Sequence, residues 1–208
     1  MRKLNIAIVG LGNIGSYLFK YLSANKKIIE KKNNCTPNIL YVSAKNKKRK
    51  RNLRIKKEQW LKNYIDATNK KEVDLIIELI GGAEGPAKEL VFRALRNKKH
   101  VVTANKALIA KYGDQLSKIA EKNKVNLEFE ASVGGGIPIL RTIKEGLATN
   151  KINKMYGILN GTCNYILTEM EKTGETFDKV LKKAQKLGYA EPGNPKLDLN
   201  GFDAFAKV

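Results

Sequence analysis

Asp203 and Lys207 lie four residues apart near the end of the chain, in the segment D-A-F-A-K. On a helix this spacing puts the carboxylate and the ammonium group on one face. The pair is either a surface ion pair or an ammonium that a carboxylate orients for proton transfer. A second lysine, Lys106, ends the segment T-A-N-K, which follows the apolar run H-V-V-T. If that run is a strand of a parallel sheet, Lys106 lies at the edge where such sheets bind ligands.

The segment from Gly10 to Gly15, G-L-G-N-I-G, matches a glycine pattern that binds dinucleotides. It follows an apolar run that begins at residue 3, and it opens an amphipathic helix. Gly10 permits a tight turn, Gly12 lets the backbone approach a pyrophosphate, and Gly15 lets the helix pack against the strand. The helix N-terminus adds free N–H groups and a partial positive charge. The other interpretation is a turn whose glycines serve packing alone, but the context favours a dinucleotide.

The residues after the second predicted strand favour NADP over NAD. An acidic residue there would hold the ribose 2′-hydroxyl of NAD, but no carboxylate occurs between Glu30 and Glu58. Ser43 can donate a hydrogen bond to a 2′-phosphate, and Lys45 can pair with it. The dense basic run that follows, residues 45–57, is either a mobile loop or the edge of a phosphate site.

The elements that must position these residues alternate between apolar runs and helical patterns up to residue 131. Apolar runs predict five strands, at 3–9, 38–43, 73–79, 100–103 and 125–131. Helical spacing predicts helices at 13–24, 86–97 and 106–122. Strands that alternate with helices of this length form βαβ units, so the fold class is α/β, a Rossmann-like doubly wound parallel sheet. This dinucleotide-binding domain comprises residues 1–131.

A glycine-rich joint, S-V-G-G-G-I-P, separates that domain from the rest of the chain. Residues 132–208 are predicted to be the start of a truncated α+β substrate and dimerisation domain. The predicted elements are a strand at 154–160 and helices at 137–147, 162–171, 176–186 and from about 202. Because few strands are available to pack against these helices, we expect exposed apolar surface and weak or no activity from these residues alone.

Composition is typical of a cytoplasmic globular protein. Apolar residues make up 42% of the chain, and no apolar run is long enough to span a bilayer. Because a strand pattern begins at residue 3, we expect no signal peptide. Cys35 and Cys163 are far apart, which favours reduced thiols, although one disulfide is compatible with the spacing. The net charge of +20 comes mostly from lysines spread along the chain. Solvated surfaces explain that charge better than nucleic-acid binding does.

Taken together, the motifs strongly resemble homoserine dehydrogenase over the whole chain. They are the glycine pattern, E-L-I-G-G (78–82), T-A-N-K (103–106), E-A-S-V-G-G-G-I-P (130–138), N-G-T-C-N-Y-I-L (160–167) and G-Y-A-E-P…D-L-N-G-F-D-A-F-A-K (188–207). The later motifs are far more specific than the glycine pattern. The resemblance implies NAD(P)-dependent interconversion of L-homoserine and L-aspartate 4-semialdehyde, in threonine, methionine and isoleucine biosynthesis. It also implies a homodimer or homotetramer when the protein is full length.

The resemblance further implies a role for individual residues. Lys207 matches the acid–base lysine, and Lys106 matches a lysine beside the nicotinamide and the substrate. Asp203 and Glu191 match residues that bind the substrate. The matches to cofactor contacts are Leu11, Asn13, Ile14 and Gly188. A structural monovalent cation, usually sodium, is implied, largely through backbone carbonyl oxygens, at Glu130, Val133, Gly135 and Ile137.

These residue types suit direct hydride transfer without a covalent intermediate. Reduction of an aldehyde builds negative charge on its oxygen, which a lysine ammonium can stabilise and then protonate. Two lysines close together lower each other's pKa, which brings one of them toward working pH. The carboxylate of Glu191 suits the ammonium group of the substrate. Cys163 has no histidine near it in sequence, so we interpret it as a packed thiol and not as a nucleophile.

The chain departs from the family pattern directly after Glu191. The order E-P-G-N-P replaces E-x-D-P, with one residue inserted and no aspartate, so we expect this loop to differ in shape. Two other functions stay open: a dinucleotide-binding regulatory module without catalysis, and a basic nucleic-acid-binding protein with steep salt dependence. The pair Asp203 and Lys207 argues against the first, since a sensor needs no proton donor. The expected partner is a small-molecule substrate, with no nucleic acid and no membrane.

Overall fold

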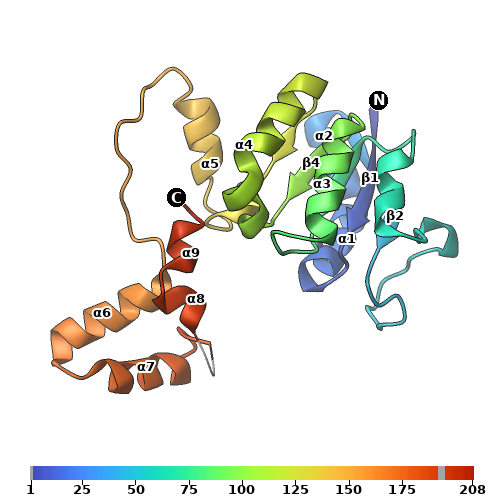
Figure 1. The fold of residues 1–208 in the computed structure, drawn as a ribbon. Helices are drawn as coiled ribbons and strands as arrows, with labels where there is room; N and C mark the ends of the chain where they lie inside the picture. The colour runs from blue at the N-terminus through green and yellow to red at the C-terminus, as the bar shows by residue number, and fades with distance from the viewer. Residues whose placement is uncertain (1, 192–194) are drawn as a thin grey trace. The chain divides into compact units, whose positions relative to one another are not determined.

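The computed structural model describes residues 2–191 and 195–208. They form two compact units, residues 1–146 and 147–208, whose elements are labelled in Figure 1. Each unit has its own buried apolar residues. The predicted domain boundary at 131/132 falls earlier than this division. Residues 132–146 belong to the first unit, because the short turns that they form pack beside the fourth strand of its sheet and beside one another.

Five parallel strands form the sheet of the first unit, in the order β2-β1-β3-β4-β5. The strands are β1 (Arg2–Val9), β2 (Cys35–Ser43), β3 (Leu75–Glu78), β4 (His100–Thr103) and β5 (Leu127–Glu128). Their sequences are rich in Ile, Val and Leu, as expected for a sheet that is covered on both faces. The strand order reverses between β1 and β3, so the loops after these two strands flank the crevice where such sheets bind ligands.

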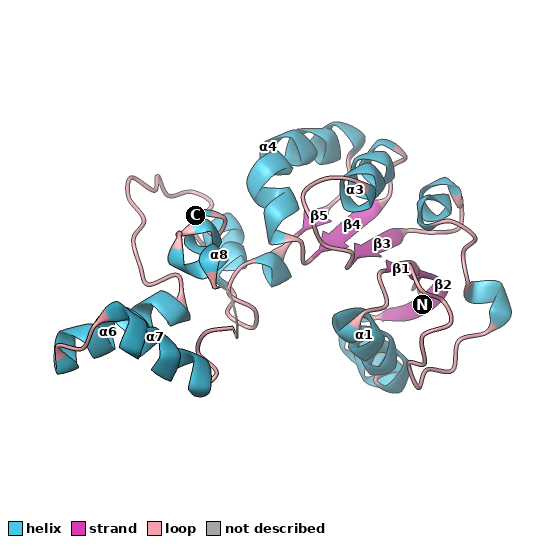
Figure 2. Ribbon diagram, turned by 60° about the horizontal axis from the view of Figure 1, so that its bottom comes forward, coloured by secondary structure: helices cyan, strands magenta, loops and turns pink. Residues whose placement is uncertain are grey.

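Helices cover both faces of this sheet (Figure 2). α1 (Asn13–Ala24) packs on one face, whereas α3 (Pro86–Arg96) and α4 (Lys106–Asn123) pack on the other. α2 (Lys26–Asn33) leads into the edge strand β2, and two short 3-10 turns, η1 (Lys57–Gln59) and η2 (Tyr64–Asn69), lie between β2 and β3. The predicted α/β class with a doubly wound parallel sheet is therefore confirmed.

Most predicted elements of this unit occur close to their predicted bounds. α1 and β4 begin and end where the sequence places them. β3 and β5 are shorter than predicted, and β5 pairs with β4 through only two residues. The sequence does not predict α2, because its only two apolar residues, Ile28 and Ile29, are adjacent and therefore do not recur at helical spacing. The helix predicted at 137–147 forms over residues 139–146, where α5 (Ile139–Arg141) continues directly into the π-helical η4 (Thr142–Gly146). The 3-10 turn η3 (Glu130–Ser132) precedes it.

The second unit is helical in its described residues. α6 (Gly161–Thr173) and α7 (Phe177–Lys186) pack against each other around Ile166, Val180, Ala184 and Ala190. α8 (Lys196–Leu199) and α9 (Phe202–Phe205) follow, and α9 is the last helix that the sequence predicts. α6 and α7 each match a predicted helix within two residues at either end.

The strand predicted at 154–160 is wrong. Residues 151–160 have no regular secondary structure, and Tyr156 and Ile158 are 88% and 77% exposed. Several residues of this segment favour β-structure, but a strand also requires a neighbouring strand with which its backbone N–H and C=O groups can pair. The described residues of the second unit contain no other strand that could supply them.

Two expectations from composition can be compared with the fold. Among the described residues, no helix combines the length and the apolar character that crossing a membrane would require. Cys35 and Cys163 are both free thiols, as expected.

Candidate dinucleotide and acid–base sites

The glycine pattern forms the turn between β1 and α1. Gly10 has a φ of 107°, and a Cβ added there would lie 2.4 Å from the carbonyl oxygen of Leu79. A Cβ on Gly15 would lie 2.0 Å from the carbonyl oxygen of Gly10. Gly12 caps α1, and a Cβ added to it would meet nothing within 4 Å. Close packing thus explains the glycines at positions 10 and 15. At Gly12 the backbone of the helix N-terminus is uncovered, so a phosphate can approach it.

The predicted contacts that surround these glycines differ in exposure. Leu11 is buried, at 2% exposed, and belongs to the core on the α1 face of the sheet. Asn13 and Ile14 form the first turn of α1, and both side chains are exposed, Ile14 by 66%. Leu11 can therefore contact a cofactor through its backbone, whereas Asn13 and Ile14 present their side chains.

The basic run folds back onto the glycine turn. Arg51 Nε donates a hydrogen bond to Leu11 O at 2.8 Å, and the same guanidinium donates to Asn46 O and Arg49 O. It also lies 5.9 Å from the centre of the Trp60 ring. This arrangement favours the phosphate-site interpretation over a mobile loop. A hollow of about 350 Å³ lies between this loop and α1, lined by Gly12, Asn13, Ser16, Tyr17, Lys20, Arg49, Lys50, Arg51 and Asn52.

Ser43 and Lys45, the predicted 2′-phosphate ligands, lie at and just beyond the end of β2. Ser43 is 6% exposed, and its carbonyl oxygen accepts a hydrogen bond from Gly10 N at 2.9 Å, which ties β2 to the glycine turn. Lys45 is exposed. Neither lines the hollow beside α1. Lys47 serves the loop itself, since its ammonium donates to Leu61 O at 2.6 Å.

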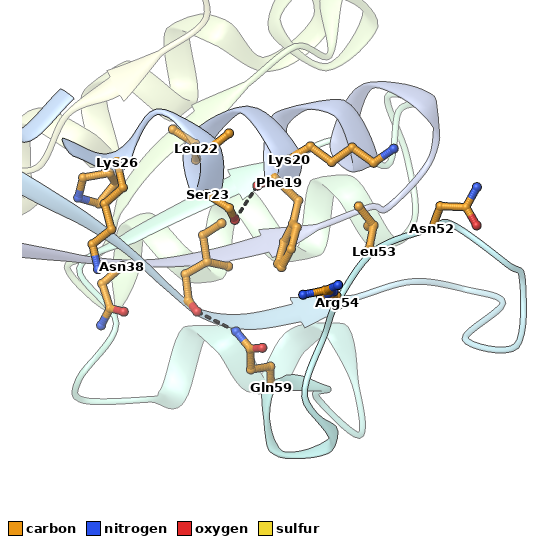
Figure 3. Close-up of a pocket in the computed structure, with 13 residues that line it drawn as sticks. Phe19, Lys20, Leu22, Ser23, Lys26, Asn38, Asn52, Leu53, Arg54 and Gln59 are labelled. Atoms are coloured by element: carbon orange, nitrogen blue, oxygen red, sulfur yellow. Dashed lines mark hydrogen bonds between the residues drawn. The ribbon is translucent and has the colours of Figure 1, made fainter. Parts of the chain in front are cut away.

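A larger hollow, of about 640 Å³, lies between the second half of α1 and the first half of β2 (Figure 3). Phe19, Leu22 and Leu53 give it an apolar part, and Gln59 Nε2 closes one side by donating to Ile39 O at 2.8 Å. Parallel sheets bind ligands beyond the carboxyl ends of their strands. Because this hollow lies beside the amino-terminal half of an edge strand, we separate it from the dinucleotide site.

The segment T-A-N-K forms the corner between β4 and α4, at the carboxyl edge of the sheet as predicted. Asn105 caps α4, because its Oδ1 accepts a hydrogen bond from Leu108 N at 3.1 Å. Its Nδ2 donates to Gly82 O at 2.7 Å, in the loop after β3. Lys106 is the first residue of α4 and is half-buried. Two neighbouring strand ends therefore fix the position of its backbone.

Asp203 and Lys207 share a face at the end of the second unit, as the four-residue spacing predicts. Lys207 Nζ donates to Asp203 Oδ2 at 2.5 Å and to Leu159 O at 2.6 Å. The two side chains are 15% and 22% exposed. An ammonium that is mostly shielded and held by two oxygens is more than the surface ion pair that the spacing alone would suggest.

Asn160 and Asp198 complete this cluster, and sequence reasoning missed their part in it. Asn160 Nδ2 donates to Asp198 Oδ1 and to Asp203 Oδ2, at 2.9 Å each. Asn160 Oδ1 accepts from Cys163 N at 2.8 Å and so caps α6. Asparagine before a helix signals the cap, but no local pattern indicates the bonds to two distant carboxylates.

Cys163 lies beside the same carboxylates. Its Sγ donates to Asp198 O at 3.3 Å. Burial raises the pKa of the Cys163 thiol, and the negative charges of Asp198 and Asp203 raise it further. The thiol is therefore kept in its neutral form, as a packed thiol and unlike an activated nucleophile.

Glu191 and Gly188, also in the second unit, follow α7. Gly188 has a φ of 79°, which suits its place at the end of the helix, and its N–H donates to Gln185 O at 3.2 Å. Glu191 is exposed. Residues 192–194, which include the inserted position of E-P-G-N-P, lie outside the described residues.

The predicted cation ligands are Glu130, at the start of η3, and Val133, Gly135 and Ile137 in the glycine-rich joint. Both oxygens of the Glu130 carboxylate accept backbone hydrogen bonds, from Leu140 N at 3.2 Å and from Arg141 N at 2.7 Å. No group of three or more His, Cys, Asp or Glu among the described residues could hold a metal ion. A cation here would therefore depend on backbone carbonyl oxygens, as the prediction has it.

Comparison with protein families agrees with both halves of the chain. Residues 10–130 match the NAD binding domain of homoserine dehydrogenase, and residues 138–208 match the homoserine dehydrogenase family itself. The chain belongs to the homoserine dehydrogenase family. The family's NAD binding domain thus contains the glycine turn, the basic loop and Lys106, whereas the second match contains Asp203 and Lys207.

Individual homoserine dehydrogenases are similar over the full chain. The enzyme of Bacillus subtilis is 43% identical over 208 residues, which are 100% of this chain and 48% of the relative. The crystal structure of a homoserine dehydrogenase from Thiobacillus denitrificans has a TM-score of 0.84 at 41% identity, and the match covers 100% of this chain and 47% of that one. A hyperthermophilic archaeal homoserine dehydrogenase in complex with NADPH has a TM-score of 0.79 at 26% identity, over 99% and 67%. The chain spans about half the length of the first two.

Proposed function

We propose that the protein acts as a homoserine dehydrogenase, which interconverts L-homoserine and L-aspartate 4-semialdehyde with a nicotinamide cofactor. The observation that carries this proposal is the shielded ammonium of Lys207, held between Asp203 and the carbonyl oxygen of Leu159. It lies in the segment that matches the homoserine dehydrogenase family. A regulatory module without catalysis has no need of such a group.

The residues of this chain suit reduction of an aldehyde. The nicotinamide, when bound, supplies the hydride. Lys207 Nζ stabilises the negative charge that develops on the substrate oxygen and then donates a proton to it. Asp203 orients this ammonium, and Asn160 orients Asp203. Lys106 adds a second positive charge at the nicotinamide end, and the carboxylate of Glu191 binds the ammonium group of the substrate.

The cofactor that the basic loop suits best is NADP. The glycine turn receives the pyrophosphate, and the 2′-phosphate adds two negative charges that an acidic residue after β2 would repel. This chain has no such residue before Glu58. Beyond β2 it has Lys45, and around the hollow beside α1 it has Arg49, Lys50 and Lys20. The archaeal relative was solved in complex with NADPH, which agrees with this choice.

A monovalent cation, sodium by preference, would occupy the glycine-rich joint. Its ligands would be largely backbone carbonyl oxygens, at Glu130, Val133, Gly135 and Ile137. Hard oxygen donors of this kind suit a hard cation. Cytoplasmic location, a role in threonine, methionine and isoleucine biosynthesis, and assembly as a homodimer or homotetramer belong to the same proposal.

One steady-state assay tests the proposed function. Because residues 1–208 alone are expected to have weak or no activity, the assay uses the protein extended to the full length of its relatives. The purified protein is given L-aspartate 4-semialdehyde with NADPH or NADH, and oxidation of the nicotinamide is followed by absorbance. We expect turnover with both cofactors and a lower KM for NADPH. The variant Lys207→Ala should lower kcat by about 10²- to 10⁴-fold, the usual contribution of a general acid, with little change in KM.

Lys172→Ala is the matched control, because Lys172 is an exposed lysine of α6 in the same unit. Its kcat should equal that of the unaltered protein. Turnover that survives in Lys207→Ala would refute the assigned acid, and equal KM values for the two cofactors would refute the preference for NADP.

A further inference from the structure

We propose that Glu78 is the positioning residue of the dinucleotide site, which it builds by fixing the loops after β1, β3 and β4 to one another. The inference rests on the proposed function, since it assigns a role at the site where the cofactor would bind. Glu78 ends β3, at the point where the strand order reverses. Ligands of such sheets bind in the crevice at this place.

Glu78 is a fully buried carboxylate, at 0% exposed. Its Oε1 accepts two backbone hydrogen bonds, from Ile80 N at 2.7 Å and from Gly81 N at 3.0 Å. Its Oε2 accepts a third, from Thr103 Oγ1 at 2.5 Å. Three donors thus converge on one carboxylate that no solvent reaches.

The first two of these bonds hold the loop after β3 beside the glycine turn. Leu79 N donates to Val9 O at 2.8 Å, and the Leu79 carbonyl lies where a Cβ on Gly10 would be. The backbone N of Ile80 lies 3.0 Å from the same Cβ position. The carboxylate of Glu78 therefore fixes the very peptide groups against which the glycine turn packs.

The third bond reaches the corner that carries Lys106. Thr103 lies opposite Glu78 in the sheet register, and its hydroxyl accepts from Asn105 N at 3.0 Å while it donates to Glu78. Asn105 in turn donates to Gly82 O and caps α4. A closed chain of hydrogen bonds therefore joins the end of β3, its glycine loop and Asn105, the residue that caps α4 directly before Lys106.

Packing alone does not account for a carboxylate at this position. A buried carboxylate costs more than an apolar side chain of the same size unless its donors compensate for lost hydration. Its donors here are two loop amides and one threonine hydroxyl, all at the ligand edge of the sheet. The benefit of Glu78 is therefore geometry at that edge, since a loop with two positive-φ glycines, Gly81 and Gly82, would otherwise be free to change conformation.

Two variants separate geometry from space filling. In Glu78→Met the side chain keeps its length, but the N–H groups of Ile80 and Gly81 lose their acceptor. In Glu78→Gln, Oε1 can still accept both N–H groups. The third bond reverses, because Nε2 donates to Thr103 Oγ1 and the Thr103 hydroxyl loses the acceptor of its own hydrogen. We expect the Met variant to bind NADPH about tenfold more weakly or worse, and the Gln variant to stay within about threefold of the unaltered protein.

The affinity is measured by nucleotide fluorescence, together with amide hydrogen exchange in the segment 79–82 and the melting temperature. Exchange in this segment should become faster in Glu78→Met and stay slow in Glu78→Gln. Thr68→Val is the control for a general loss of stability. Thr68 is buried (1% exposed) and lies outside the Glu78 network, and its hydroxyl donates to Ile65 O. It should leave the affinity for NADPH unchanged at a comparable melting temperature.

If Glu78→Met does not fold, the pair Thr103→Val and Thr103→Ser decides. Valine removes the hydroxyl that joins Glu78 to Asn105, and serine restores it, so only the valine variant should lose affinity. NADPH binding within threefold of normal in the Met or Val variant, with slow exchange at 79–82, would overturn the role of Glu78. Failure of the unaltered protein to bind either NADPH or NADH would instead overturn the proposed function.

Discussion

Asp198 and Asp203 lie beside two groups that respond in opposite ways to negative charge. A carboxylate stabilises the ammonium of Lys207, whose hydrogen bond Asp203 accepts. The same charges disfavour the thiolate of Cys163, and burial disfavours it more. In the proposed reaction, one cluster would therefore supply a proton donor and suppress a nucleophile at the same time. Direct hydride transfer requires the first and is helped by the second, because no thiohemiacetal competes with reduction.

The suppressed thiol gives a prediction about pH. In a Cys35→Ser background, alkylation of Cys163 by iodoacetamide should follow its thiolate, which appears only above the ordinary thiol pKa because burial and two carboxylates raise the pKa of Cys163. The rate should still be rising at a pH where a free cysteine has levelled off. Cys163→Ser should retain turnover. Fast alkylation of Cys163 at neutral pH would contradict a raised pKa for this thiol.

At the scale of elements, the turn between β1 and α1 separates two kinds of glycine. Gly15→Ala puts a methyl group 2.0 Å from the carbonyl oxygen of Gly10. The clash cannot be relieved by rotating a side chain, because the oxygen belongs to the backbone. We expect a loss of stability of about 2 kcal/mol or more, seen as a lower denaturation midpoint. Gly12→Ala meets no atom of the protein, so it should fold normally.

The matching prediction for Gly12→Ala is a loss of cofactor. Its methyl group would lie where the pyrophosphate must approach, so the affinity for NADPH should fall by about tenfold or more at an unchanged midpoint. Normal affinity in this variant would mean that the turn serves packing alone, which is the other interpretation of the glycine pattern.

Elements whose signals are local could be predicted from the sequence, and interactions between distant residues could not. α1 follows from its periodicity and its glycine start, and Asp203 and Lys207 share a face because helical spacing requires it. The strand expected at 154–160 does not form, because a strand needs a neighbouring strand to pair with, and its own residues cannot show whether one is present. The hydrogen bond from Arg51 to Leu11 O has no sequence signature, because it joins residues that are far apart in the chain. The role of Glu78 has none either, because its complete burial appears only in the fold.

At the scale of the whole molecule, part of the charge of +20 is structural. Lys47 donates to Leu61 O, Lys99 to Lys70 O and Val73 O, and Lys207 to Leu159 O. Ammonium groups that satisfy backbone carbonyls in this way are not arranged to track phosphates along a nucleic acid. The basic loop is the exception. Because Arg51 bonds to the glycine turn, we expect the positive charge of this loop to serve the proposed dinucleotide site.

The two compact units divide the proposed functions between them, and this division can be tested by cutting the chain. Every residue of the glycine turn, the basic loop, the Glu78 network and Lys106 precedes Gly146, whereas the Lys207 cluster follows Leu147. Near the start of the second unit, residues 151–160 have no regular structure, and Tyr156 is 88% exposed. Chymotrypsin at a low dose should therefore cleave first after Tyr156, because proteases prefer exposed and irregular backbone.

The amino-terminal product, residues 1–156, should bind NADPH within about twofold of the intact protein, since it keeps every group assigned to the dinucleotide except Gly188, whose side chain is a single hydrogen. Turnover should be lost with the removal of Asp203 and Lys207. Mass spectrometry locates the cut, and Tyr156→Ser is the control, which should resist cleavage at this position. A first cut inside residues 2–146, or a product that no longer binds NADPH, would show that dinucleotide binding is not a property of the first unit alone.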